Sequence, residues 1–148
     1  QQTTICSLRQ RPIFGEQLSY DGLSQDELLH LIGQRTKDTR DAYDAPDVLG
    51  FGVGDLKELG RAIFNRINSE LHQLFCGGQA SDKEQRQELE KILRLDPASL
   101  QAGLTIFLIS TFGLDATIAA IIAVLLLKRV ILPAGGELCA FWAKNIAI

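Results

Sequence analysis

The chain has 148 residues, of which 46% are hydrophobic and 22% are charged, and its formal net charge is −3 at pH 7. This length suits one domain with a substantial core, and the high apolar content excludes disorder over most of the chain. The balance of charge gives no broad basic field for nucleic acid. Three cysteines at long spacings exclude a disulfide scaffold and a zinc cage.

The charged residues are concentrated in the first two thirds of the chain. Acidic residues are in excess over residues 1–100, and the charged residues after them are only Asp115, Lys128, Arg129, Glu137 and Lys144. We therefore expect one domain, 1–148, with an N-terminal arm at 1–20, a polar and acidic helical part at 21–95, and a hydrophobic helical part at 96–148.

The first predicted helix begins at a capping box. Ser24 and Glu27 have the spacing at which each side chain bonds the other residue's backbone amide. The apolar residues that follow predict a short helix ending near Gly33 or one turn later. Before it, residues 1–20 are expected to form a short extended arm that tucks apolar side chains against the helices.

The longest predicted helix covers about residues 55–76. Asp55 is its expected N-cap, and apolar residues then recur at steps of three and four, as on one face of an amphipathic helix. A second capping box, Ser81 with Glu84, predicts another helix that reaches about Leu95.

The most informative segment runs from Ala102 to Leu127 and contains one charged residue, Asp115. Taken whole, it exceeds the roughly 20 residues that span a bilayer, and a basic pair follows it. Alternatively, Gly113 ends one helix and Asp115 caps a second. We favour this hairpin, over about 97–132, because Asp115 in the middle of a span would cost about 2.5–3.5 kcal/mol.

The second helix of the hairpin, from Ala116 to about Leu132, is apolar on every side and belongs in the centre of a bundle or in lipid. A chain of this length can bury one such helix, whereas two would leave apolar surface for a partner, a second copy or a membrane. The candidate membrane or interface residues are Ile118, Ile121, Ile122, Leu125, Leu126, Lys128, Arg129 and Trp142. Trp142 lies on a last predicted helix, where it either sits at a membrane interface or closes the bundle; we favour the second.

This pattern, over about residues 97–132, resembles the hydrophobic hairpins of pore-forming helical proteins such as the channel-forming colicins. The resemblance is one of architecture, and it assigns no functional residue.

The residues that usually carry chemistry form no recognisable constellation. His30 and His72 have no metal-ligand spacing and are interpreted as surface or boundary residues. Cys76 and Cys139 are interpreted as small buried hydrophobes, and Cys6 as a residue of the arm. The glycines Gly50, Gly52 and Gly54 are interpreted as an entry loop before the long helix. A second pattern is interpreted as a solvated connection or one helical turn: Asp38, Asp41, Asp44 and Asp47.

The sequence thus predicts an all-α, single-domain bundle of five or six helices. We expect a non-enzymatic protein that acts through protein association or self-assembly, with its hairpin in the core or in an oligomer interface. The alternatives are a membrane-inserting or pore-forming effector that uses the same hairpin, and an enzyme without a recognisable motif. No cofactor, metal or nucleic-acid partner is expected, and the sequence leaves the location open between cytoplasmic and membrane-associated.

Overall fold

The computed structural model describes residues 20–42 and 56–147, and every regular element within them is helical. The predicted all-α class is confirmed. The expected arm, the glycines at 50–54 and the cap at Asp55 lie outside the described residues. The elements are η1 (Tyr20–Gly22), α3 (Gln25–Ala42), α4 (Leu56–Cys76), η3 (Ala80–Asp82), α5 (Lys83–Leu93), α6 (Pro97–Phe112), α7 (Ala116–Leu126), η4 (Leu127–Ile131), α8 (Leu132–Ala134) and α9 (Leu138–Ala143).

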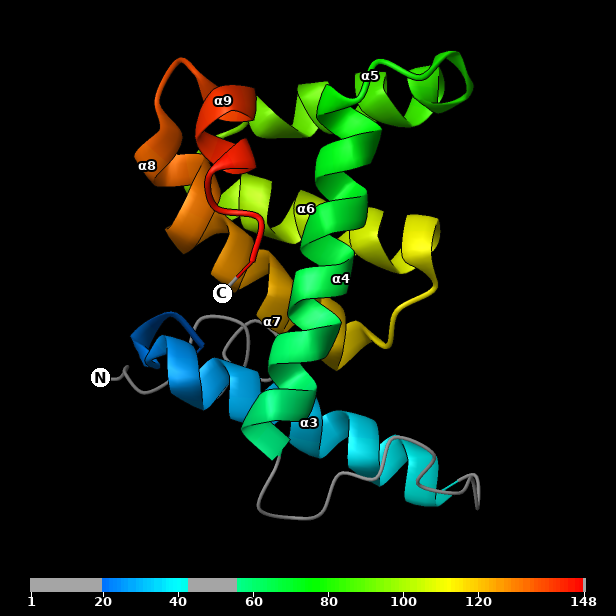
Figure 1. The fold of residues 1–148 in the computed structure, drawn as a ribbon, viewed down its shortest axis with the longest axis vertical. Coiled ribbons are helices and arrows are strands. Elements are labelled where there is room, and N and C mark those ends of the chain that lie inside the picture. Colours follow the sequence, from blue (N-terminus) through cyan, green and yellow to red (C-terminus); the bar gives the residue numbers. More distant parts are fainter. Residues whose placement is uncertain (1–19, 43–55, 148) are drawn as a thin grey trace, which may run out of the picture.

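Helix α4 is the scaffold, as the amphipathic pattern predicts. It runs the length of the molecule, with α3 across its N-terminal end and α5 and α9 at its C-terminal end (Figure 1). The apolar stripe predicted for this helix faces the core, where Leu59, Ile67 and Leu71 are buried. The stripe also buries one polar side chain, Asn68, which is 0% exposed.

Helix α3 starts at the predicted capping box but does not stop near Gly33. The Ser24 hydroxyl lies 3.1 Å from the Glu27 amide, and the Glu27 carboxylate lies 2.8 Å from the Ser24 amide. The predicted end was wrong because Gly33 is a contact residue rather than a terminator. A Cβ there would lie 1.9 Å from the carbonyl oxygen of Leu56. The helix continues to Ala42, so Asp38 and Asp41 lie within α3, whereas Asp44 and Asp47 lie outside the described residues.

The start of α5 also differs from the prediction. Residues Ala80–Asp82 form a 3₁₀ turn, and α5 begins at Lys83 with Asp82 as an N-cap that makes no side-chain cap bond. The prediction of a second capping box is therefore wrong, because the 3₁₀ turn places Asp82, and not Ser81, at the N-cap position of α5. The helix ends at Leu93, two residues before the predicted end.

The predicted hairpin is present as α6 and α7, and α7 lies in the core. Asp96 caps α6 by accepting from the Ser99 amide at 3.2 Å, and α7 packs against α3 and α6. The second helix runs on through η4, a π-helical turn, to Ala134 rather than ending at Leu132. In that turn the amide of Leu132 donates to the carbonyl of Leu127, and the wider coil accommodates Pro133 in a continuing helix.

Two of the cysteines form a disulfide that was not predicted from the sequence. Cys76, at the end of α4, is bonded to Cys139 in α9, 63 residues later in the chain. The interpretation of both residues as small buried hydrophobes was wrong, because the fold brings their Cα atoms to 5.8 Å. Only tertiary packing reveals this pairing, since α9 has to turn back along α4.

Candidate interaction surface on α6

The apolar candidate residues of α7 lie inside the molecule. Each is at most 8% exposed, so none offers a surface in this state: Ile118, Ile121, Ile122, Leu125 and Leu126. The basic pair follows on η4, where Lys128 is exposed and Arg129 is half-buried. Arg129 Nη1 donates to Gln25 Oε1 at 2.9 Å, which ties η4 to the start of α3.

Trp142 is also buried, at 1% exposure, in the position that closes the bundle. Its indole Nε1 donates to Asn68 Oδ1 at 2.7 Å, and its ring meets the edge of His72 at a centroid distance of 5.5 Å. The partner of the indole N–H is therefore a buried amide rather than an interfacial headgroup.

The two predicted turn residues occupy the tip of the hairpin. Gly113 takes the left-handed conformation, with φ 67°, which ends α6. Asp115 caps α7 by accepting from the amides of Thr117 and Ile118 at 3.0 and 3.2 Å. Its carboxylate also accepts two hydrogen bonds, each of 3.0 Å, from the guanidinium of Arg35 on α3. One side chain thus caps α7 and fastens the tip to the polar part of the chain.

The same contacts set the ionisation of the tip. The hydrogen bond from Arg35, helped by the Ile118 amide and the guanidinium charge, lowers the pKa of Asp115 below its ordinary value, against a smaller opposing effect of burial. The paired carboxylate also raises the pKa of Arg35. Because the folded pKa of Asp115 is depressed, its stabilisation is present above the unfolded pKa, near 3.9, and disappears as the pH falls through the folded value.

We expect Asp115→Ala to lower the free energy of unfolding by about 1–2 kcal/mol at neutral pH through loss of the cap. The deficit should be smaller at pH 3 than at neutral pH, because pH 3 lies below the unfolded pKa, near 3.9, and stabilisation that rests on a depressed folded pKa fades as the pH falls from there. Asp115→Asn keeps a capping oxygen but not the charge, so its loss should be smaller. Urea denaturation at both pH values measures this, and an Asp115→Ala deficit that does not change with pH would contradict the assignment.

Among the described residues, the most exposed large apolar side chain lies on α6, not on α7. Ile106 is 65% exposed at the middle of α6, and Ala102 and Ser110 lie one turn away on either side. Ile109 borders them on the helix, and Leu95, 46% exposed between α5 and α6, lies beside α6 at Gly103, where a Cβ would be 3.8 Å from the Cδ1 of Leu95. We call this set, Leu95, Ala102, Ile106, Ile109 and Ser110, the α6 outer face.

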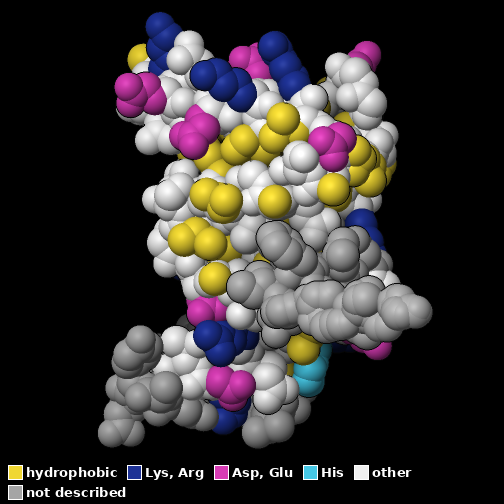
Figure 2. Space-filling model, turned by 180° about the vertical axis from the view of Figure 1, so that it is seen from behind, with side chains coloured by type: hydrophobic (Ala, Val, Ile, Leu, Met, Phe, Trp, Pro, Cys, Tyr) yellow, Lys and Arg dark blue, Asp and Glu magenta, His cyan; other side chains and the backbone are white. Residues whose placement is uncertain are grey.

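The α6 outer face is uncharged and has few unmet polar groups. No charged residue occurs within Pro97–Phe112. The Ser110 hydroxyl lies within hydrogen-bond reach of the carbonyls of Ile106, at 3.1 Å, and Phe107, at 3.3 Å. In the view from behind, hydrophobic side chains gather over the upper and middle part of the molecule, with charged side chains around them (Figure 2). Such a face can lose its water at little polar cost.

Ile106 was not among the residues predicted from the sequence. Its signal was indirect: two helices that are apolar on all sides cannot both be hidden in a chain of this length. The apolar residues of the hairpin indicate leftover apolar surface, but they do not indicate which of its two helices is central. The structure makes α7 the central helix and leaves one side of α6 outside.

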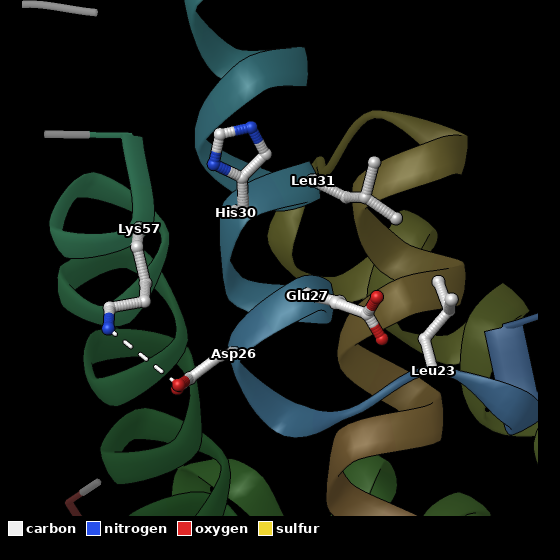
Figure 3. Close-up of a pocket in the computed structure, with 6 residues that line it drawn as sticks. All are labelled: Leu23, Asp26, Glu27, His30, Leu31 and Lys57. Atoms are coloured by element: carbon white, nitrogen blue, oxygen red, sulfur yellow. Dashed lines mark ion pairs between the residues drawn. The ribbon is translucent and has the colours of Figure 1, made fainter. Parts of the chain in front are cut away.

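A shallow pocket of about 440 Å³ lies between α3 and the start of α4. In Figure 3, Asp26 points toward Lys57, with 3.7 Å between carboxylate and ammonium, while Glu27 points toward Leu23 and Leu31. His30 completes the lining. Glu27 is engaged in the capping box and Asp26 in the ion pair, so both carboxylates have structural partners.

Within the described residues, no group of side chains could bind a metal, and one helix could span a membrane by its length and composition. Within 20–42 and 56–147, no group of three or more His, Cys, Asp or Glu residues could hold a metal ion. One helix in this part, Ala116–Ala134, is long and apolar enough to cross a membrane, and 61% of its most apolar window is buried in the bundle. Core helices of water-soluble proteins share these properties.

Comparison with known proteins adds no relative to this description. The chain matches no protein-family model, no curated protein and no solved structure.

Proposed function

We propose that this protein is a non-enzymatic helical module that pairs with a second copy of itself through the α6 outer face. The observation that carries the proposal is Ile106, a large apolar side chain left 65% exposed at the centre of an uncharged helix. Solvation of such a side chain is unfavourable, and burial against a partner removes that penalty.

A second copy suits this face because the face is complementary to itself. Ile106 projects between Ala102 and Ser110, which are one turn away on each side and are small. When two such helices cross, the isoleucine of each can lie over a small residue of the other, as ridges fit grooves. The face bears no charge, so a two-fold arrangement brings no like charges together.

The size of the face sets the expected strength of pairing. Helix α6 has 16 residues and is therefore about 24 Å long. One side of it, with Leu95, covers less than the roughly 800 Å² per partner of a standard interface. We therefore expect a reversible dimer whose population rises with protein concentration.

The test is the molar mass as a function of protein concentration. Sedimentation or light scattering in detergent-free buffer should show a monomer–dimer equilibrium, and Ile106→Lys should abolish the dimer while the chain stays folded. Leu132→Lys is the matched control, because Leu132 is 57% exposed and lies outside the α6 outer face. A monomeric wild type at all concentrations, or a dimer that survives Ile106→Lys, would contradict the proposal.

A second candidate function is insertion of the hairpin into lipid. It is favoured by the 19-residue apolar helix Ala116–Ala134, which carries Lys128 and Arg129 in its last third. In this alternative the hairpin leaves the bundle, so the Asp115–Arg35 pair breaks and the buried face of α7 moves into the bilayer. Lipid binding by the purified chain separates the two candidates.

A further inference from the structure

The C-terminal helix α9 depends on tertiary contacts for its existence. It has six residues, and its N-cap, Glu137, makes no side-chain cap bond. A helix this short is not stable alone. The segment that leads into α9 contains two exposed glycines, Gly135 and Gly136, and Gly135 has a positive φ of 64°. The segment is therefore built as a short arm that pivots on a glycine pair.

Besides the disulfide, the arm is held by the core contacts of Trp142, by the partly buried Leu138 and Ile146, and by hydrogen bonds to one residue of α4. Trp142 is its one fully buried side chain, and Ala140, Ala143 and Lys144 are exposed. Asn68 of α4 makes the polar contacts: its Oδ1 accepts from Trp142, and its Nδ2 donates to the carbonyls of Asn145 and Ile146 at 3.2 and 2.7 Å. Water can replace these hydrogen bonds once the arm moves away.

The disulfide is placed to decide whether the arm stays docked. It joins Cys139 in the first turn of α9 to Cys76 at the C-terminal end of α4. Both cysteines are only partly buried, so a reducing thiol can approach. Helix α9 packs on α4 and η4, and its release would uncover this end of the core.

We propose that the Cys76–Cys139 disulfide is a redox-controlled clasp, which holds α9 over α4 and η4 when oxidised and lets it swing away at Gly135–Gly136 when reduced. A dithiol is the reductant. One thiolate attacks a sulfur of the disulfide and forms a mixed disulfide, and the second thiol then displaces the remaining protein sulfur. The protein gains two electrons and two protons as two thiols, and the dithiol becomes a disulfide.

The fluorescence of Trp142, the one tryptophan of the chain, reports the position of the arm. On reduction of the native protein with dithiothreitol, its emission should shift to the red and acrylamide should quench it several-fold more effectively. Emission wavelength and quenching are the readouts because a disulfide itself can alter intensity. Far-UV circular dichroism should lose no more signal than α9 provides.

Two variants complete the test. Cys139→Ser should reproduce the exposed tryptophan without any reductant. Cys6→Ser is the control, because it removes the third cysteine and leaves the clasp intact, so it should respond to reduction as the wild type does. An unchanged tryptophan after full reduction, loss of the whole helical signal, or a disulfide that resists reduction until the protein unfolds would each overturn the proposal.

Discussion

Replacing Ile121 with lysine is expected to unfold the protein. Ile121 is 1% exposed in α7 and lies in the core cluster with residues of α3, α4 and α6. An ammonium group there would have no partner and no water, and unpaired buried charges are among the few changes that cost about 4 kcal/mol or more. This cost is a large share of the 5–15 kcal/mol that stabilises a typical domain. Thermal and urea denaturation followed by circular dichroism measure the effect.

The matched control lies on the other helix of the same hairpin. Ile106→Lys introduces the same charge at a site that is 65% exposed, so its effect on the unfolding free energy should stay within about 0.5 kcal/mol. If instead the hairpin normally leaves the bundle for lipid, Ile121→Lys should abolish membrane association and leave the polar part folded. A folded Ile121→Lys protein would therefore contradict the assignment of α7 to the core.

Gly60→Ala should destabilise the protein by about 3 kcal/mol, the upper range for overpacking. A Cβ on Gly60 would lie 1.8 Å from the carbonyl oxygen of Leu29, and one on Gly33 would lie 1.9 Å from that of Leu56. The backbones of α3 and α4 therefore touch at this crossing, and an added methyl group must push them apart. Since alanine is favoured over glycine in helices by about 1 kcal/mol, local propensity predicts the opposite sign.

The sign of the change thus tests the crossing. Gly33→Ala should behave as Gly60→Ala does, because each glycine faces the backbone of the other helix. Gly22→Ala is the control, since a Cβ there meets nothing within 4 Å. Urea midpoints for the three variants suffice, and a Gly60→Ala protein as stable as the Gly22→Ala protein would show that the helices do not meet this closely.

Local patterns account for most of the fold. The capping box at Ser24, the amphipathic period of α4 and the caps at Asp96 and Asp115 act within a few residues of the chain, so the sequence alone predicts where those helices start. The hairpin was predictable for the same reason, because Gly113 and Asp115 are suited to opposite ends of two helices.

The features that the sequence did not reveal depend on distant partners. Gly33 was predicted to end a helix, whereas its role is to admit Leu56 from another helix. The disulfide pairs Cys76 with Cys139 across 63 residues, and Asp115 meets Arg35 across 80. Periodicity and capping carry no information on such contacts, so neither the disulfide nor the ion pair at the hairpin tip could be predicted.

The sequence predicts that the hairpin has exposed apolar surface, but it does not predict on which helix, because this depends on packing. Composition indicates that the hairpin carries more apolar surface than a small bundle can hide. The choice between the two helices depends on how α3 and α4 close over them, and this puts Ile121 inside and Ile106 outside. The residues named from the sequence therefore lie in the core, and the proposed surface is on α6.

The most direct test of the proposal that α7 remains in the protein's own core is flotation of the purified full chain with anionic liposomes. Beside it, the molar mass is measured in detergent-free buffer. We expect the protein to remain in the aqueous fraction as a monomer–dimer mixture, with Trp142 emission unchanged by lipid. Flotation of the wild type with the vesicles, lost in Ile121→Lys, would contradict the proposal and make lipid the destination of the hairpin.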